Sequence, residues 1–171
     1  MKRTVSGPLT SGPRAKRAGG FTLIELVITV AIVAVLASAV MPLNELALQR
    51  SREQDLRRSL REIRDGIDAY KQAWDDGRLT KNVNDTGYPK SLDDLVKGVE
   101  DQKSAKRDKI YFMRRIPRDP FATSETQTNA ETWGKRAYQS PPDDPKEGDD
   151  VFDVFSLATG TGINGRPYKE W

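Results

Sequence analysis

The sequence contains no cysteine and no histidine in its 171 residues. Without cysteine the chain has no disulfide bond and no thiol nucleophile, and without both residue types it has no zinc site built from Cys and His. A Ser-His-Asp triad is excluded because histidine is missing. The lack of disulfides allows an oxidising compartment but does not require one.

The remaining polar residues do not form a recognisable catalytic or cofactor pattern. Asp75 with Asp76, and Asp93 with Asp94, are adjacent carboxylates. Neighbours on a helix point about 100° apart and would not flank one scissile bond, so helix ends and solvent explain these pairs better. Residues 160–165 imitate a Gly-x-Gly-x-x-Gly dinucleotide fingerprint, but no predicted helix follows them. We therefore predict no catalytic residue, no cofactor site and no enzyme activity.

A positive net charge is confined to the N-terminus. Five of the 28 Lys and Arg residues lie in residues 1–20, which contain no acid, and the rest of the chain carries 23 basic and 25 acidic residues. The net charge of +3 is thus a property of the first 20 residues. This distribution gives little support to nucleic-acid binding, and we expect no nucleic-acid partner.

One long apolar run is present, over residues 21–41. At about 1.5 Å per helical residue it spans roughly 31 Å, close to the hydrocarbon thickness of a bilayer. Glu25 is its only charged residue. Burying that carboxylate in lipid costs on the order of a few kcal/mol, so Glu25 needs a partner of opposite charge. We predict that residues 21–41 form a transmembrane helix.

The residues before this run are arranged unlike a secretory signal peptide. In such a peptide the cleavage site follows the apolar region, whereas here the small residues Ala18-Gly19-Gly20 precede it. A cut after Gly20 would remove residues 1–20 as a basic leader and leave the apolar run on the mature chain. Before the cut, the basic residues hold the N-terminus in the cytoplasm and direct the C-terminal part outward.

Residues 20–25, Gly-Phe-Thr-Leu-Ile-Glu, together with Pro42, resemble the class III signal of type IV pilins and type II secretion pseudopilins. The resemblance implies that a prepilin peptidase cuts between Gly20 and Phe21 and methylates the new amine of Phe21. An α-amino group with a reference pKa near 8 is mostly protonated at neutral pH and offers Glu25 a counter-charge. In the family this pairing is thought to form between neighbouring subunits during assembly. The alternative is a simple signal-anchor helix with an accidental glutamate.

A second helical segment is predicted over residues 42–76. Pro42 lacks an amide hydrogen and is expected to kink or locally unwind the helix where the apolar run ends. An apolar stripe at steps of four and three then predicts a stem helix that carries the globular domain: Leu56, Leu60, Ile63, Ile67, Tyr70 and Trp74. Because it covers only about three heptads, packing on the protein's own sheet is favoured over a coiled-coil seam.

Two stretches flank this stripe. Residues 45–55 have no continuous apolar face, and we expect them to be solvated or to face another subunit. Asp75-Asp76-Gly77 supplies a plausible C-terminal stop, because glycine adopts the left-handed conformation that often follows a helix.

Residues 77–171 predict one small domain. Ser91 is a natural N-cap for a short helix, with Asp94 three residues on. Residues 97–109 are highly charged, and we expect a mobile excursion there.

Two candidate strands follow, over residues 133–139 and 151–156, and we predict a small antiparallel sheet of about three strands. The remaining residues form a glycine-rich loop that we expect to order itself through Tyr168 and Trp171.

Four segments of residues 77–171 are similar to the G-type major pseudopilin of type II secretion. They are, in order, Tyr-Pro-Lys-Ser-Leu (88–92), Arg-Ile-Pro-Arg-Asp-Pro-Phe (115–121), Trp-Gly-Lys-Arg-Ala-Tyr (133–138) and Asp-Val-Phe-Ser-Leu (153–157). Two features depart from that pattern. An insertion covers residues 124–132, and the loop after Leu157 lacks the aspartates with which many relatives bind calcium.

Calcium binding is left open by the sequence. Calcium takes six to eight oxygen ligands, including several carboxylates. The available carboxylates lie before the usual loop without EF-hand spacing, and a solvated acidic loop is the better interpretation: Asp143, Asp144, Glu147, Asp149, Asp150 and Asp153. Thr161 and Asn164, with backbone carbonyls, would make at most a weak site. We therefore name no metal ligand.

These features favour an α+β, type IV pilin-like fold, in which a long N-terminal helix packs on a small antiparallel sheet with a structured C-terminal loop. The resemblance implies a single-pass protein of the bacterial inner membrane, with a cytoplasmic N-terminus and residues 77–171 in the periplasm. It implies a subunit that polymerises with itself into a type II secretion pseudopilus and meets minor pseudopilins, the inner-membrane secretion platform and prepilin peptidase. The alternatives are a type IV pilin for adhesion, motility or DNA uptake and, from another class, a signal-anchored periplasmic enzyme.

Overall fold

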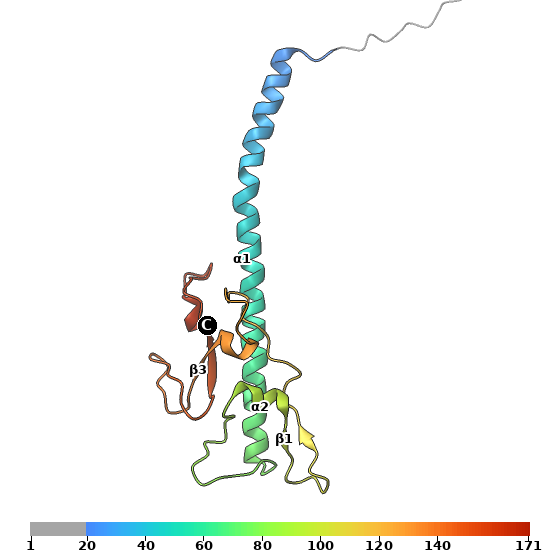
Figure 1. Cartoon of the computed structure of the whole chain (residues 1–171). Coiled ribbons are helices and arrows are strands. Elements are labelled where there is room, and N and C mark those ends of the chain that lie inside the picture. Colours follow the sequence, from blue (N-terminus) through green and yellow to red (C-terminus); the bar gives the residue numbers. More distant parts are fainter. Residues whose placement is uncertain (1–19) are drawn as a thin grey trace, which may run out of the picture. The chain divides into compact units, whose positions relative to one another are not determined.

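Helix α1, Leu23–Asp75, is the longest element of the protein and contains 53 residues (Figure 1). The computed structural model describes residues 20–171, apart from the side chains of residues 39–43. The predicted leader, except for Gly20, lies outside the described residues. The chain divides into two compact units, Met1–Leu43 and Asn44–Trp171, and α1 runs through both.

The first unit contains the N-terminal part of α1. The backbone is helical from Leu23 onward, including at Pro42, and a bend at Pro42 stays a prediction. Within residues 20–171, no helix meets the combined requirements of length and apolar character for crossing a membrane.

The C-terminal end of α1 lies in the second unit, at the predicted stop. The amide of Gly77 donates to the carbonyl of Trp74 (3.0 Å), and the amide of Arg78 donates to that of Ala73 (2.9 Å). These two hydrogen bonds together form the Schellman motif, in which the residue directly after the helix has the left-handed backbone conformation. Gly77 takes that conformation, with a φ of 70°. The predicted stop is confirmed.

Short elements follow α1 in the second unit. They are α2 (Leu92–Lys97), β1 (Val99–Glu100), β2 (Lys109–Ile110), the 3-10 helix η1 (Asn129–Thr132), β3 (Trp133–Arg136), β4 (Asp153–Ser156) and the 3-10 helix η2 (Tyr168–Glu170). Two antiparallel pairs form among them, β1 with β2 and β3 with β4. The α+β class is confirmed, whereas the prediction of one sheet with about three strands is wrong.

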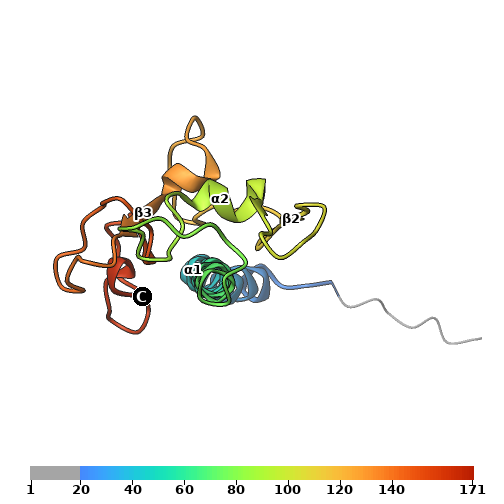
Figure 2. The same cartoon turned by 90° about the horizontal axis from the view of Figure 1, so that it is seen from below.

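The hydrophobic core forms on one face of α1. Leu56, Leu60, Ile63 and Ile67 are at most 2% exposed, which confirms this part of the predicted stripe. Tyr70 packs at the edge against Phe112, with ring centroids 5.1 Å apart. The other buried members of the core are Leu92, Leu95, Met113, Ile116, Trp133, Val151, Val154 and Tyr168. In Figure 2 the elements after α1 gather around one side of this helix.

Strand β3 is shorter than predicted because the chain leaves the β ladder after Arg136. In the register, Trp133 lies opposite Ser156 and Arg136 lies opposite Asp153. The next amide, that of Ala137, donates to the carbonyl of Lys146 (2.9 Å) in the following loop. This loop bond takes the place of a ladder bond, so the predicted strand over residues 133–139 ends three residues early.

Helix α2 begins where Ser91 was predicted to cap it. The Ser91 amide donates to the Asp94 carboxylate (2.9 Å), which is the reciprocal contact of a capping box. Leu92 and Leu95 are the buried residues of α2, so this short helix contributes both of them to the core.

The charged residues 97–109, expected to form a mobile excursion, instead contain strand structure and a fixed anchor. They include β1 and the start of β2. Asp101 is only 9% exposed, and its carboxylate receives a hydrogen bond from Arg78 Nη2 (2.6 Å). The amide of Asp101 also donates to the carbonyl of Asp108 (2.9 Å). The prediction of a mobile segment rested on its high charge. It was wrong because the partner of Asp101, Arg78, lies 23 positions away and no local pattern indicates the ion pair.

Candidate functional site

The start of α1 is organised by Thr22. The amide of Leu26 donates to the Thr22 carbonyl (3.1 Å), and the amide of Glu25 donates to the Thr22 hydroxyl (3.3 Å). Thr22 therefore acts as the N-cap and satisfies one of the free amides of the first turn. Glu25 lies in that first turn, where the helix dipole favours a carboxylate by about 0.3–1 kcal/mol. Local structure alone thus gives Glu25 a stabilising position.

The predicted cleavage site lies just before the helix. Gly20 and Phe21 have no regular secondary structure, and the Phe21 side chain is 79% exposed. A peptide bond outside a hydrogen-bonded helix is easier for a protease to bind in extended form. The position of this bond is compatible with cleavage, which itself stays a prediction.

The first turns of α1 present an apolar surface on all sides. The large apolar side chains of these turns, and that of Phe21 just before them, are between 53% and 82% exposed: Phe21, Leu23, Ile24, Leu26, Val27, Ile28, Val30, Ile32, Val33, Val35 and Leu36. Two polar side chains are internally satisfied, since the Thr29 hydroxyl donates to the Leu26 carbonyl (2.8 Å) and the Ser38 hydroxyl donates to the Val35 carbonyl (2.7 Å). An exposed apolar surface of this extent is typical of contact with lipid or with other protein chains.

Glu25 interrupts this surface and is itself exposed. Among residues 20–171 it forms no ion pair. The counter-charge that the sequence predicts, the amine of Phe21, arises only in a cleaved chain. The pairing of Phe21 with Glu25 stays a prediction.

Residues 15–41 match the prokaryotic N-terminal methylation motif. The motif supports a type IV pilin or pseudopilin-like protein. The motif supports cleavage and methylation by a prepilin peptidase, polymerisation into filaments, and a membrane-anchored assembly at the surface or in the periplasm. It also favours a structural subunit over an enzyme, and it does not distinguish a pilin from a pseudopilin. No curated protein and no solved structure gives a significant match to the chain.

A second feature of the chain is the attachment of the C-terminal loop to the stem through Glu53. This carboxylate is only 6% exposed. It accepts hydrogen bonds from the Ile163 amide (2.8 Å), the Tyr168 hydroxyl (3.1 Å) and Gln49 Nε2 (3.1 Å). Burial raises the pKa of Tyr168, so its hydroxyl remains protonated and able to donate. One stem carboxylate therefore fixes two points of the loop.

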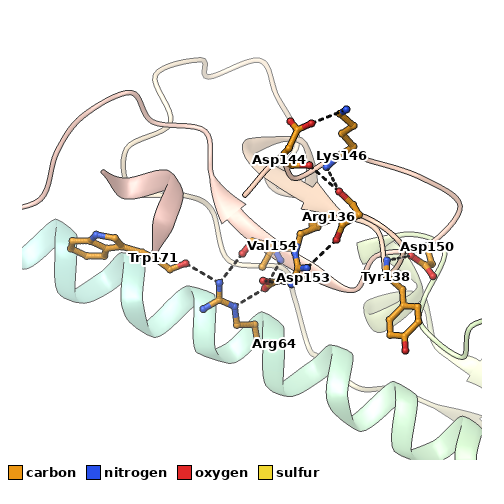
Figure 3. A network of polar contacts seen from close by, with 10 residues as sticks. Arg64, Arg136, Tyr138, Asp144, Lys146, Asp150, Asp153, Val154 and Trp171 are labelled. Atoms are coloured by element: carbon orange, nitrogen blue, oxygen red, sulfur yellow. Dashed lines mark hydrogen bonds and ion pairs between the residues drawn. The ribbon is translucent and has the colours of Figure 1, made fainter. Parts of the chain in front are cut away.

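Arg64 attaches β4 and the last described residue to the stem (Figure 3). Its Nε donates to the Asp153 carboxylate (2.8 Å), and its Nη2 donates to the main-chain oxygens of Val154 (3.0 Å) and Trp171 (2.9 Å). Asp153 also pairs with Arg136 Nη2 (3.3 Å) on the neighbouring strand. The arrangement joins α1, both strands of the second sheet and the tail in one polar network.

Asp119 organises the segment that carries the Asp-Pro-Phe string. It is 2% exposed, accepts a hydrogen bond from the Ser156 hydroxyl (2.6 Å) and accepts another from the Phe121 amide (2.8 Å). The Phe121 ring then stacks on Tyr168, with centroids 4.3 Å apart. Tyr168 in turn contacts Trp171 edge-on at 5.2 Å, as expected for the closing loop.

The insertion over residues 124–132 is attached at both ends. Arg118 donates to the carbonyls of Ser124 and Gln127 at one end. Asn129 donates to the carbonyl of Ile116 (2.8 Å) at the other. The 3-10 helix η1 within this insertion was not predicted, because its polar residues show no periodicity.

The carboxylates considered for calcium are divided among protein contacts. Asp150 accepts hydrogen bonds from the Tyr138 amide (2.8 Å) and the Thr86 hydroxyl, and Asp153 belongs to the Arg64 network. Asp144 pairs with Lys146 (2.8 Å). In the part of the chain that the structure describes, no group of three or more acidic residues is placed to hold a metal ion.

The sequence prediction missed Gln49 and Glu53 as contact residues. Residues 45–55 were expected to be solvated or to face another subunit, which is wrong for these two. A signal was present, because Glu53 precedes Leu56 by three residues and Gln49 precedes Glu53 by four. Both therefore continue the buried stripe by one and two turns toward the N-terminus.

Proposed function

We propose that this chain is a major pseudopilin, which polymerises into the periplasmic pseudopilus of a type II secretion system. The observation that carries the proposal is the N-terminal methylation motif at the start of a helix whose apolar side chains are exposed on all sides. A helix with that surface needs lipid before assembly and neighbouring helices afterwards. The subunit works by assembly and performs no catalysis.

The segments of residues 77–171 favour the pseudopilin branch. They resemble the G-type subunit in sequence order, and several of them contact one another here. Trp133 Nε1 donates to the carbonyl of Pro117 (2.8 Å), the Tyr88 and Tyr138 rings stack with centroids 5.5 Å apart, and Ser156 donates to Asp119. The absence of cysteine also separates this chain from pilins with a cysteine pair.

In this proposal the chain has four functional parts. Residues 1–20 are a basic leader removed by prepilin peptidase, and residues 21–41 anchor the protein in the inner membrane and later form the filament core. Residues 42–76 are the stem, and residues 77–171 form the periplasmic domain. The contact between subunits is heterologous and does not close, so it continues into a filament. Minor pseudopilins and the inner-membrane secretion platform are the proposed partners of that assembly.

The second candidate is a type IV pilin subunit that serves adhesion, motility or DNA uptake. The methylation motif is equally consistent with it. The two candidates differ in the system that depends on the protein, because a pseudopilin is required for secretion and a pilin for a surface fibre.

Deletion of the gene in its native host tests the proposal. We expect loss of type II cargo from the medium, with cargo retained in the periplasm, and restoration by the wild-type chain. Surface fibres and twitching motility are measured in the same deletion strain, because a pilin would be required for them. Normal secretion together with lost fibres or motility would exclude the pseudopilin role and favour the pilin.

A further inference from the structure

The β1–β2 hairpin and the residues that follow it carry a concentration of positive charge. This basic segment, residues 97–115, contains seven basic and three acidic residues. All seven basic residues are exposed: Lys97, Lys103, Lys106, Arg107, Lys109, Arg114 and Arg115. Two of them approach carboxylates, Lys97 at 2.6 Å and Arg107 at 3.9 Å. Within residues 20–171 the other five form no ion pair, so most of this charge is free to meet a partner.

A cavity of opposite charge lies between the loop before α2 and the loop that joins β3 to β4. Its volume is about 640 Å³, and its charged lining residues are four acids and two lysines: Asp85, Glu147, Asp149, Asp150, Lys90 and Lys146. Both lysines are paired, Lys90 with Asp85 (3.9 Å) and Lys146 with Asp144 (2.8 Å). Asp149 is exposed and forms no ion pair in the part of the chain that the structure describes. The cavity therefore keeps a net negative charge and suits a cationic occupant.

An exposed tyrosine accompanies each of these features. Tyr111 directly follows β2 in the basic segment. Tyr138 lies two residues after β3 and stacks on Tyr88, which lines the cavity, with ring centroids 5.5 Å apart. Tyrosine is enriched in protein interfaces because its ring offers apolar area and its hydroxyl a hydrogen bond. The basic segment and the cavity can thus contribute apolar contact as well as charge.

The basic segment and the cavity lie on opposite sides of α1. In both Figure 1 and Figure 2 the β1–β2 hairpin is on one side of this helix, and β3, which leads into a wall of the cavity, is on the other. Because the hairpin lies on the far side, the cavity is left to a different occupant than the hairpin of its own chain.

Both features are nevertheless attached near the same end of α1. The basic segment is held there by the bond from Arg78 to Asp101 (2.6 Å). Beside the cavity, Gly87 packs so closely on the Trp74 ring that an added Cβ would come within 2.8 Å of it. The basic segment and the cavity therefore lie at a similar level along the stem.

We propose that the basic segment of one copy of the chain docks in the cavity of a neighbouring copy. The inference rests on the proposed function, because an N-terminal anchor common to all subunits makes their stems parallel. Parallel neighbours around one axis turn opposite sides toward each other, and features at one level of the stem then meet. The contact joins two different surfaces and does not close, so it repeats along the filament.

Charge makes this contact selective. The basic segment has a net charge of +4, and residues 139–150, with five acids and one lysine, have a net charge of −4. Opposite charges favour the contact of basic segment with cavity, and like charges disfavour the contact of two basic segments or two cavities. Exposed ion pairs are individually weak and are screened by salt, so the contact directs the packing of subunits that the apolar helices hold together.

Charge reversal tests the proposal in the full chain, in cells that assemble the wild type into filaments. The segment variant carries Lys103→Glu and Lys106→Glu, and the cavity variant carries Glu147→Lys and Asp149→Lys. Each should lower filament yield at low salt by about fivefold. The chain with all four changes should recover most of the yield, because each contact regains opposite charges.

The matched control reverses two exposed basic residues outside both features, Arg166→Glu with Lys169→Glu, and should assemble as the wild type does. A loss in the segment variant alone would mean that the basic segment binds a different acidic partner, and it would overturn the proposal. Wild-type yield from both the segment and the cavity variants, or no recovery in the combined chain, would do the same.

The absence of cysteine permits a second test, by cross-linking. Filaments of a chain with Lys106→Cys and Asp149→Cys should give a ladder of linked subunits with a short bis-maleimide. Each single variant should stay unlinked, since the proposed contact brings together one residue of each kind. Linked dimers from a single variant would show that like features meet and would contradict the proposal.

The same reagent separates this inference from the proposed function. Filaments that give no ladder would overturn the contact while leaving the assembly role in place. A ladder in membranes of cells in which the wild type forms no filament would support the contact and contradict the assembly role. Neither filament nor ladder would overturn both.

Discussion

The Tyr168 hydroxyl donates to the Glu53 carboxylate across 3.1 Å, joining the C-terminal loop to the stem over 115 positions of sequence. Glu53 also accepts a hydrogen bond from the Ile163 amide. The residues of the C-terminal loop form further backbone hydrogen bonds with one another. The amide of Tyr168 donates to the Gly160 carbonyl (3.1 Å), and that of Gly162 donates to the Arg166 carbonyl (2.9 Å). Side-chain contacts from the stem therefore order a loop that has little regular structure.

Replacement of Glu53 should release this loop. Glu53→Ala leaves the buried Tyr168 hydroxyl and the part-buried Ile163 amide without their acceptor, and the loss of an acceptor by a buried donor costs about 1–3 kcal/mol. We expect the free energy of unfolding to fall by about 2–4 kcal/mol in urea titrations of the full chain in detergent. Asp55→Ala, on the same helix but exposed, is the control and should change stability by less than about 0.5 kcal/mol. Equal stability of the two variants would contradict the proposal that Glu53 holds the C-terminal loop on the stem.

Asp119 should be a second position with a large effect. Asp119→Ala removes the acceptor of the Ser156 hydroxyl and the Phe121 amide at a site that is 2% exposed. We expect a loss of about 2–4 kcal/mol and faster hydrogen exchange at the Phe121 amide. Asp143→Ala, at an exposed acidic position, is the control. Unchanged exchange at Phe121 would mean that this bond does not hold the segment.

The ion pair between Arg78 and Asp101 predicts an acid-dependent loss of stability. Hydrogen bonds from the Arg78 guanidinium, and next from the Lys103 amide, hold the pKa of Asp101 below its ordinary value of 3.8. The unfolded carboxyl therefore takes up a proton more readily than the folded one. The stability that this pair contributes is complete well above pH 3.8 and is lost as the pH falls through the lower folded value.

Urea midpoints measured between about pH 6 and pH 2.5 check this expectation. Asp101→Asn should lower the midpoint at the upper end and show a smaller decline toward the lower end than the wild type. Asp143→Asn should decline as the wild type does. An undiminished decline in Asp101→Asn would assign the acid sensitivity to other carboxylates.

The sequence predicted most reliably the features that depend on residues close together in the chain. The stripe through Leu56 and Ile67 repeats at helical spacing, the stop at Gly77 needs only a left-handed residue, and the cap at Ser91 needs only Asp94. Each is a local preference that the fold did not override.

Features that depend on distant residues were missed. The pairs Glu53 with Tyr168, Arg64 with Asp153 and Arg78 with Asp101 join residues 23 to 115 positions apart. No local pattern indicates which charge will find such a partner, and so the charged segment around Asp101 was expected to be mobile. The division into two small sheets was missed for the same reason, since strand pairing is set by tertiary packing.

Processing at the predicted bond can be measured directly. In cells with an active prepilin peptidase, intact mass should show a chain that begins at Phe21 and carries one added methyl group. Gly20→Ala retains a small residue, but its added Cβ alters the residue before the cut, and we expect slower processing. The uncut chain should accumulate without the peptidase. Retention of residues 1–20 in its presence would contradict the assignment of the leader.

Variants of Glu25 can distinguish a structural role of this residue at the start of α1 from a role in filament assembly. Its place in the first turn, beside the N-cap Thr22, is worth about 0.3–1 kcal/mol of helix stability, which a neutral residue would lose without preventing membrane insertion. We therefore expect Glu25→Ala and Glu25→Gln to reach the membrane and be processed, yet to give little filament. Both variants lack the negative charge proposed to pair with the amine of Phe21. Membrane fractionation and electron microscopy of filaments measure the two steps.

Two comparisons decide between the roles of Glu25. Thr22→Ala removes the N-cap while keeping the carboxylate, so it should weaken the first turn by about 1 kcal/mol and still assemble. Glu25→Gln keeps the size of the side chain and its capacity for hydrogen bonds but loses the charge. If Glu25→Gln assembles like the wild type and Thr22→Ala does not, the residue serves the start of α1, and its pairing with a neighbouring subunit is wrong. If Thr22→Ala assembles and Glu25→Gln does not, assembly requires the negative charge of Glu25. A charge in an apolar filament core needs a group of opposite charge, and the Phe21 amine is the proposed one.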